Sequence, residues 1–211
     1  MTPAGAQATH ETDGTNGPVV VLIGPPGAGK SAVGPLVADL LGVQFRDTDA
    51  DVAAAAGKPI GDIFVEDGEE TFRELERAAV TSALSEQGAE PAREVLALGS
   101  GAVLDEGVRQ LLAGRPVVYL SASFGTVVRR IGLDRPRVVV PGNPRGRLRA
   151  MLNERLPLYQ GLAAVTVETD DLDPDELAAQ IAATVTAGPP VAGPPLPGPP
   201  LAGPPPSEDS R

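Results

Sequence analysis

The fold is decided by the run Val19-Val20-Val21-Leu22-Ile23 and the loop after it, Gly24-Pro25-Pro26-Gly27-Ala28-Gly29-Lys30-Ser31. A continuous aliphatic run of this kind is typical of a strand that is covered on both faces. The loop matches the pattern G-x-x-x-x-G-K-[ST] of a phosphate-binding loop. Apolar residues then recur at helical spacing, at Val33, Leu36, Val37, Leu40 and Leu41. Strand, glycine-rich loop and helix together are the context that such a loop requires.

Each part of the loop has a chemical task. Gly27, Ala28 and Gly29 let backbone N–H groups turn toward phosphate oxygens at the positive end of the following helix. Lys30 is expected to reach the β- and γ-phosphates of ATP, and the Ser31 hydroxyl is expected to bind Mg²⁺. Of the 17 Lys and Arg residues, Lys30 and Lys58 are the only lysines, which indicates that a compact ammonium is needed here. The complete motif disfavours the alternative of a glycine-rich turn that binds nothing.

A proline interrupts the pattern of this helix. Pro35 has no N–H to offer the Ser31 carbonyl, and its ring crowds that carbonyl. We therefore expect a local kink or a displaced carbonyl between Ser31 and Pro35.

Composition excludes several classes of protein. The 211 residues include 42% hydrophobic and 3% aromatic residues with no Trp, so the core must consist of Val, Leu, Ile and Ala. No Cys is present, which excludes disulfides and thiolate sites. A net charge of −11 argues against a nucleic-acid or anionic-membrane binder. The N-terminus lacks signal-peptide features, and no apolar run approaches the roughly 20 residues of a membrane span. We predict a soluble, cytoplasmic, monomeric protein.

Three regions differ in composition. Residues 1–17 are small and polar and are expected to form a flexible arm, whereas 18–186 carry the patterns of a folded domain built on the phosphate-binding loop. Residues 187–211 are rich in Pro and Gly, which disfavours helix and strand and predicts a disordered tail. A solubilising tail is favoured over a proline-rich ligand for a partner domain.

The folded region alternates short aliphatic runs with helical patterns. After the first strand, such runs lie at 43–45, 95–98, 117–120 and 165–167. Helical spacing lies between them, at Phe72, Leu75, Ala79 and Leu84, and later at Leu148, Leu152 and Leu156. This alternation predicts an α/β fold with a parallel sheet and helices on both faces.

The second expected strand ends at Asp47-Thr48-Asp49. Ligands bind at the carboxyl edge of such sheets. On an extended chain, carboxylates at i and i+2 point the same way, so one can serve Mg²⁺ and the other a substrate hydroxyl. The alternative is an Asx turn that caps the next helix.

Further motifs follow in order. They are Ile63-Phe64, Gly68-Glu69, Phe72-Arg73, Glu76, Leu98-Gly99-Ser100-Gly101-Ala102, Arg129-Arg130, Arg137 and Glu154-Arg155-Leu156-Pro157-Leu158-Tyr159. Together with the phosphate-binding loop and the Asp-Thr-Asp, this collinear set resembles the shikimate kinase family over residues 18–185. The resemblance implies a fold like that of nucleoside monophosphate kinases, with a five-stranded parallel sheet and a mobile lid, here about 131–146. It also implies MgATP-dependent phosphorylation of the 3-hydroxyl of shikimate, in the route to chorismate and aromatic amino acids.

The resemblance also implies roles for individual residues. Asp49 is expected to bind the acceptor hydroxyls and assist their deprotonation, and Asp47 to reach Mg²⁺ through water. Lid residue Arg137 is expected to contact ATP and to act in catalysis with Lys30 and Asp49. Arg73 and Arg155 are expected to bind the shikimate carboxylate, and Gly99, Ser100 and Gly101 are expected to pack beneath the ring. Arg130 is expected to stack against adenine.

Alternatives remain for several of these residues. Arg73 and Glu76 could be a solvent-exposed i, i+3 pair, and Arg129-Arg130 could merely complement a helix dipole. The arginines of 135–149 could form an RNA-binding segment, although the overall acidity of the chain favours a lid that closes on phosphate.

The chain also departs from the family's pattern. Ser100 replaces the middle glycine of the family's Leu-Gly-Gly-Gly-Ala loop, and Val138-Val139-Val140 replaces the usual Pro-Leu-Leu. Competing hypotheses are a gluconate- or nucleotide-type kinase and a nucleotide-binding scaffold without catalysis.

Overall fold

The computed structural model describes residues 18–85, 93–134 and 143–187. They form a parallel five-stranded sheet in the order β2-β3-β1-β4-β5. The strands are β1 (Val20–Ile23), β2 (Gln44–Asp47), β3 (Glu94–Ala97), β4 (Val117–Ser121) and β5 (Val165–Glu168). Each strand overlaps the aliphatic run that predicted it, and the predicted α/β class is confirmed.

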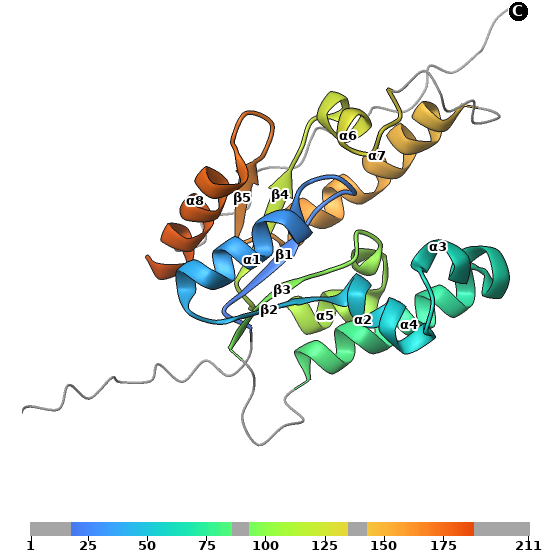
Figure 1. Ribbon diagram of the computed structural model, residues 1–211, viewed down its shortest axis with the longest axis horizontal. Coiled ribbons are helices and arrows are strands. Elements are labelled where there is room, and N and C mark those ends of the chain that lie inside the picture. Colours follow the sequence, from blue (N-terminus) through green and yellow to red (C-terminus); the bar gives the residue numbers. More distant parts are fainter. Residues whose placement is uncertain (1–17, 86–92, 135–142, 188–211) are drawn as a thin grey trace, which may run out of the picture.

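Helices cover both faces of this sheet (Figure 1). On one face lie α1 (Lys30–Leu41) and α8 (Pro174–Thr186), which contact each other. On the other face lie α4 (Gly68–Leu84), α5 (Glu106–Leu112) and α7 (Pro144–Leu162). The other described helical elements are α2 (Thr48–Ala56), α3 (Ile60–Asp62), the π-helical turn η1 (Ile63–Asp67), the 3₁₀ turn η2 (Ala102–Leu104) and α6 (Phe124–Arg130).

The central strand shows why the sheet needs two helical layers. Val20 and Leu22 pack against α1 and α8, whereas Val21 and Ile23 belong to the core shared with α4, α5 and α7. All four side chains are at most 1% exposed. Burying one such side chain contributes about 1.5–3 kcal/mol, so strands with aliphatic residues on both faces anchor the loops at their carboxyl ends.

Helix α1 continues from Lys30 to Leu41 through Pro35. The helix is therefore not ended by the proline, and the expected kink stays a prediction. The preceding residue, Gly34, is buried, and a Cβ placed on it would overlap the ring of Phe45 on β2. The helix backbone can approach β2 this closely because residue 34 has no side chain.

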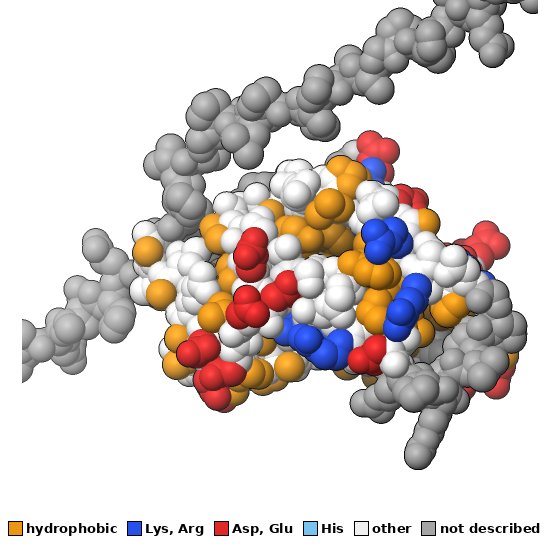
Figure 2. Space-filling model, turned by 90° about the horizontal axis from the view of Figure 1, so that it is seen from above, with side chains coloured by type: hydrophobic (Ala, Val, Ile, Leu, Met, Phe, Trp, Pro, Cys, Tyr) orange, Lys and Arg blue, Asp and Glu red, His pale blue; other side chains and the backbone are white. Residues whose placement is uncertain are grey.

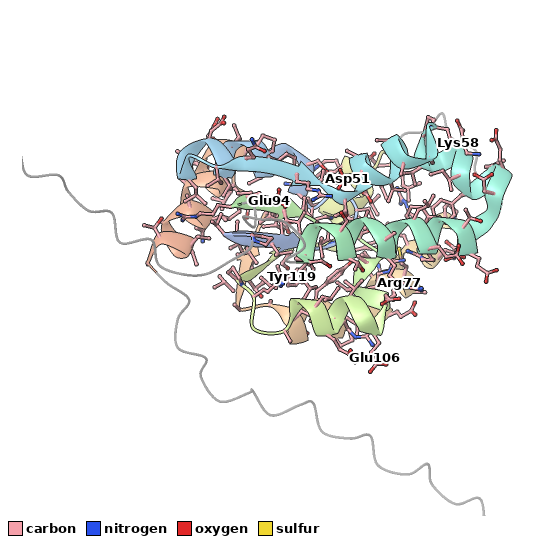
Figure 3. The ribbon with its side chains drawn as sticks, turned by 90° about the horizontal axis from the view of Figure 1, so that it is seen from below. Asp51, Lys58, Arg77, Glu94, Glu106 and Tyr119 are labelled. Carbon is pink, nitrogen blue, oxygen red and sulfur yellow. The ribbon has the colours of Figure 1, made fainter. Side chains whose placement is uncertain are left out.

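The elements from α2 to α4 form an arm of the molecule with its own small core of Val52, Ile63 and Phe72. Lys58 links the α2–α3 connection to η1, through ion pairs of 2.9 Å to Glu66 and 2.6 Å to Asp67. Figure 3 shows Lys58 at the outer end of this arm. The inner end carries Thr48 and Glu76, and it faces the sheet.

Some expectations concern residues that the structure does not describe. The arm expected at 1–17 lies outside the described residues, as does the tail beyond Ala187. Residues 135–142 of the expected lid also lie outside them. In the ranges that are described, no helix is both long and apolar enough to cross a membrane.

Candidate functional site

The loop between β1 and α1 is wrapped around the amino group of Lys30. Its Nζ donates hydrogen bonds to the carbonyls of Gly24 at 2.8 Å and Pro25 at 3.1 Å. Gly27 and Gly29 have positive φ angles of 73° and 102°, a conformation that glycine adopts without strain. The loop thus has the shape expected of a phosphate cradle, with a cation at its centre and the N-terminus of α1 behind it.

The charge of Lys30 is held in a partly dehydrated place. Burial lowers the pKa of Lys30 to about 8, against the opposing effect of the carboxylates of Asp49 and Asp47, while Arg155 lowers it further. Desolvation disfavours the charged form of an amine. Lys30 is therefore close to the two carboxylates and the arginine that were predicted to share a site with it.

Asp47 connects the cradle to the end of β2. Its Oδ2 accepts a hydrogen bond of 2.6 Å from the Ser31 hydroxyl, and its Oδ1 accepts one of 3.0 Å from the backbone N–H of Asp49. The second bond caps α2, so the Asx-turn alternative is present together with the contact to Ser31. The assumption of an extended chain was wrong, because the strand ends at Asp47 and Asp49 lies in the first turn of α2.

Between these aspartates, Thr48 ties β2 to the glycine loop after β3. Its side chain is fully buried, and its hydroxyl accepts a hydrogen bond of 3.0 Å from the N–H of Gly99. The sequence reasoning gave Thr48 no role. A small hydroxyl residue between two carboxylates at a strand end was the available signal, but its partner is 51 positions away in sequence.

Arg73 and Glu76 form a largely buried ion pair on α4. Their closest atoms are 2.7 Å apart, and the side chains are 26% and 5% exposed, so the solvent-exposed alternative is wrong. Arg73 also lies 3.2 Å from Glu69. Burial raises the pKa of Glu76, and Asp49 raises it further, while Arg73 and Arg155 lower it. Glu76 is thus a member of the cluster that sequence reasoning did not assign to the site.

The glycine loop is the surface on which these charged groups meet. A Cβ added to Gly99 would lie 2.5 Å from Asp49 Oδ1 and 2.7 Å from Glu76 Oε1. A Cβ on Gly101 would overlap the Arg73 guanidinium. A small cavity borders the cluster at Arg73, Glu76 and Gly101 and extends to the pair of Arg77 and Asp105, with Arg77 labelled in Figure 3.

From the opposite side, α7 brings Arg155 and Tyr159 to the same loop. Arg155 Nη1 donates to the Ser100 carbonyl at 3.2 Å, and the Tyr159 hydroxyl donates to the same carbonyl at 2.7 Å. Arg155 is 9% exposed. The residues predicted to bind the acceptor, including Asp49 and Arg73, are therefore brought together around Gly99–Gly101, although they come from α2, α4 and α7.

Asp49 has the electrostatic environment of a candidate base. Burial raises the pKa of Asp49, as does the neighbouring Asp47, while Lys30 lowers it. A carboxylate with a raised pKa accepts a proton more readily than an exposed aspartate does. The candidate base Asp49, the cation Lys30 and the arginines thus occupy one partly buried cluster.

Arg130, expected to lie against adenine, lies on the other side of the cradle. Its guanidinium donates to the carbonyl of Gly27 at 3.1 Å and to the Thr169 carbonyl at 2.6 Å, so it links the cradle to the end of β5.

On the face formed by α6, α7 and α8, basic side chains gather toward α6 and α7 and acidic ones toward α8 (Figure 2). Arg137 lies outside the described residues.

The architecture and the site define a class. A β1–loop–α1 phosphate cradle that faces carboxylates and arginines across the carboxyl edge of a parallel sheet is the arrangement of a P-loop kinase. Comparison with known proteins narrows this class. The family model "Shikimate kinase" matches residues 26–186, and the chain belongs to the shikimate kinase family.

Individual relatives support the assignment. The shikimate kinase of Thermobifida fusca is 52% identical over 165 residues, which are 78% of this chain and 93% of that protein. The shikimate kinase of Salinispora arenicola is 51% identical over 166 residues, 79% of this chain and 96% of its own length. A solved shikimate kinase of Acinetobacter baumannii in complex with shikimate is 34% identical, with a TM-score of 0.71, and the match covers 82% of this chain and 94% of that one. The resemblance inferred from the motifs is confirmed.

Proposed function

We propose that this protein transfers the γ-phosphoryl group of ATP to the 3-hydroxyl of shikimate. The observation that carries the proposal is the meeting of Asp49, Glu76, Arg73 and Arg155 around Gly99–Gly101, beside the Lys30 cradle. Shikimate has a carboxylate and several hydroxyls, so its site needs guanidinium donors and carboxylate acceptors together. Family membership supports the same acceptor, and neither a gluconate-type kinase nor a scaffold without catalysis is favoured.

On the nucleotide side, the Gly27–Ser31 backbone and Lys30 bind the phosphates. The Ser31 hydroxyl and the Asp47 carboxylate, 2.6 Å apart, are the hard oxygen ligands that suit Mg²⁺. Among the described residues no group of three or more His, Cys, Asp or Glu could hold a metal. This fits Mg²⁺, which usually binds through one or two protein groups together with substrate phosphates and waters. When bound, the ion neutralises charge that develops on the transferred group.

On the acceptor side, the residues have separate tasks. Arg155 and Arg73 bind the carboxylate and orient the ring, which packs on Gly99 and Gly101. Asp49 accepts the hydrogen bond of the reacting hydroxyl and takes its proton as the phosphoryl group arrives. Glu76 holds Arg73 in place through the 2.7 Å pair. Phosphoryl transfer depends mainly on such positioning and on charge stabilisation.

Two contacts to ATP complete the proposal. Arg130 adjoins the cradle and the Thr169 end of β5, where it can reach the adenine side of the nucleotide. Arg137 supplies a lid cation that stabilises charge on the transferred phosphoryl group and helps to exclude water. A site closed in this way avoids simple hydrolysis of ATP.

The function is tested by a coupled assay of ADP release with shikimate, gluconate and nucleoside monophosphates as separate acceptors. We expect turnover with shikimate and not with the others, and a product that ³¹P NMR identifies as the 3-phosphate. Absence of ADP release with shikimate would overturn the proposal, whereas release with gluconate alone would identify the alternative kinase. Nucleotide binding without turnover of any acceptor would favour the scaffold.

A further inference from the structure

The Ser100 peptide is held from α7 by two side chains one helical turn apart. Tyr159 Oη donates to the Ser100 carbonyl at 2.7 Å, and Arg155 Nη1 donates to it at 3.2 Å. Arg155 Nη1 is also 3.4 Å from the Ser100 hydroxyl. One carbonyl therefore accepts from both residues, so the position of Arg155 depends on a peptide that Tyr159 fixes.

These bonds are made by Nη1 and leave the Nε of the Arg155 guanidinium without a partner among the described residues. Nη1 lies on the same side of the group as Cδ, so the opposite edge consists of Nε–H and Nη2. In the described part of the chain, Arg155 Nε is buried and has no hydrogen-bond partner. A buried donor without an acceptor costs free energy, and the Nε–Nη2 edge matches the two oxygens of a carboxylate. The edge is thus oriented for a ligand that carries an acid group.

Tyr159 is suited to act as a fixed donor. Its side chain is 1% exposed, and its ring stacks on Tyr119 with the centroids 5.2 Å apart. Burial raises the pKa of Tyr159 to about 12, so the hydroxyl keeps its proton at any pH used for an assay. The ring stack and the helix hold that hydroxyl in one direction, toward Ser100.

We propose that Tyr159 is a positioning residue for the substrate carboxylate, acting through the Ser100 peptide on Arg155, and that the Ser100 hydroxyl supports the same alignment. The inference rests on the proposed function, because it needs an acceptor that carries a carboxylate. Without the Tyr159 hydroxyl the Ser100 peptide can rotate, and the Nε–Nη2 edge turns away from the acid group. The reacting hydroxyl, held by Asp49, is unaffected once the substrate is bound.

The central test is Tyr159→Phe, which removes one oxygen and keeps the ring stack. We expect the KM for shikimate to rise about three- to tenfold, the effect of losing one hydrogen bond, while kcat and the KM for ATP stay within about twofold. The matched control is Tyr119→Phe, which removes the same atom from the stacked ring. Tyr119 makes no described hydrogen bond to Ser100 or Arg155, so its variant should keep the wild-type KM.

A second variant and a second substrate separate positioning from general damage. Ser100→Ala should raise the KM for shikimate in the same direction by a smaller factor, and it keeps the test available if Tyr159→Phe fails to fold in thermal unfolding. With shikimic acid amide, which has no carboxylate, both variants should match the wild type. An unchanged KM in both variants, or an equal rise with the amide, would overturn the inference.

The same measurements distinguish this inference from the proposed function. Wild-type turnover of shikimate with unchanged variants refutes the positioning role and leaves the function standing. If the wild type binds shikimate in calorimetry without turning it over, the function fails, and the dissociation constants of the variants still decide the role of Tyr159. If the wild type neither binds nor phosphorylates shikimate, both proposals fall.

Discussion

Replacing Gly99 by alanine should lower the activity of the protein strongly without unfolding it. The new Cβ would lie 2.5 Å from Asp49 Oδ1 and 2.7 Å from Glu76 Oε1, whereas ordinary contacts begin at 3.4 Å. Both close atoms are ends of flexible side chains, so they can move while the backbone stays in place. The Asp49 carboxylate must then shift by about 1 Å, the displacement that costs roughly a hundredfold in rate when it affects a catalytic group.

We therefore expect kcat/KM for shikimate to fall about a hundredfold, equivalent to about 2.7 kcal/mol of transition-state stabilisation. The dissociation constant for ATP should change less than about twofold, because Lys30 and Ser31 do not contact the new methyl group. ADP release measures the first quantity, titration with a fluorescent ATP analogue the second, and thermal unfolding reports whether the fold is kept.

The matched control is Gly161→Ala on α7. A Cβ there meets no atom within 4 Å, and alanine favours a helix by about 1 kcal/mol over glycine. This variant should keep full activity and unfold at the same or a higher temperature. If Gly99→Ala keeps the wild-type kcat/KM, the claim that the glycine loop positions Asp49 is refuted.

Three other substitutions test the cradle, the base and the helix contact. Asp49→Asn should leave ATP affinity nearly unchanged and lower kcat by about a hundredfold or more in the ADP-release assay; full activity would remove Asp49 from the mechanism. Lys30→Met should abolish turnover yet raise the unfolding free energy at pH 7 by roughly 1–3 kcal/mol, since burial holds the pKa of Lys30 at about 8 instead of 10.5. Between pH 8 and 10.5 only the unfolded chain keeps the proton on Lys30, so the difference in unfolding free energy between variant and wild type should shrink over this range in denaturant titrations. A variant less stable than the wild type at pH 7 would contradict this. Gly34→Ala should lower the unfolding free energy by about 1–3 kcal/mol because the new methyl group overlaps the Phe45 ring. Adding Phe45→Leu to this variant should recover part of the loss. An unchanged melting temperature in Gly34→Ala would show that the contact relaxes freely.

The sequence predicted those parts of the fold whose signal is local. The run at 19–23 is aliphatic at every position because β1 is covered on both faces, so its burial could be foreseen. The cradle could be foreseen because its glycines, Lys30 and Ser31 are contiguous. The position of Asp49 was foreseen only in part: the Asx-turn alternative named the helix cap at Asp47, whereas the preferred extended chain placed Asp49 on the strand and not in the first turn of α2.

The parts of the site that were missed depend on distant partners. Glu76 was part of the motif set but was given no role at the site, and its burial results from the close approach of α4 to Gly99 and Gly101. Thr48 meets its partner across the sheet edge, which no periodicity reveals. Family resemblance supplied the roles of Arg73 and Arg155, while Arg137 lies outside the described residues and keeps its role as a prediction.

The tyrosine stack has a practical consequence for spectroscopy. The chain contains two Tyr and no Trp, so its near-ultraviolet emission comes from tyrosine, and both tyrosines belong to the stacked pair Tyr119–Tyr159. One of these rings is bonded to the peptide that also holds Arg155. Tyrosine emission and the tyrosine bands of near-ultraviolet circular dichroism therefore report on the surroundings of the Ser100 peptide without an added dye.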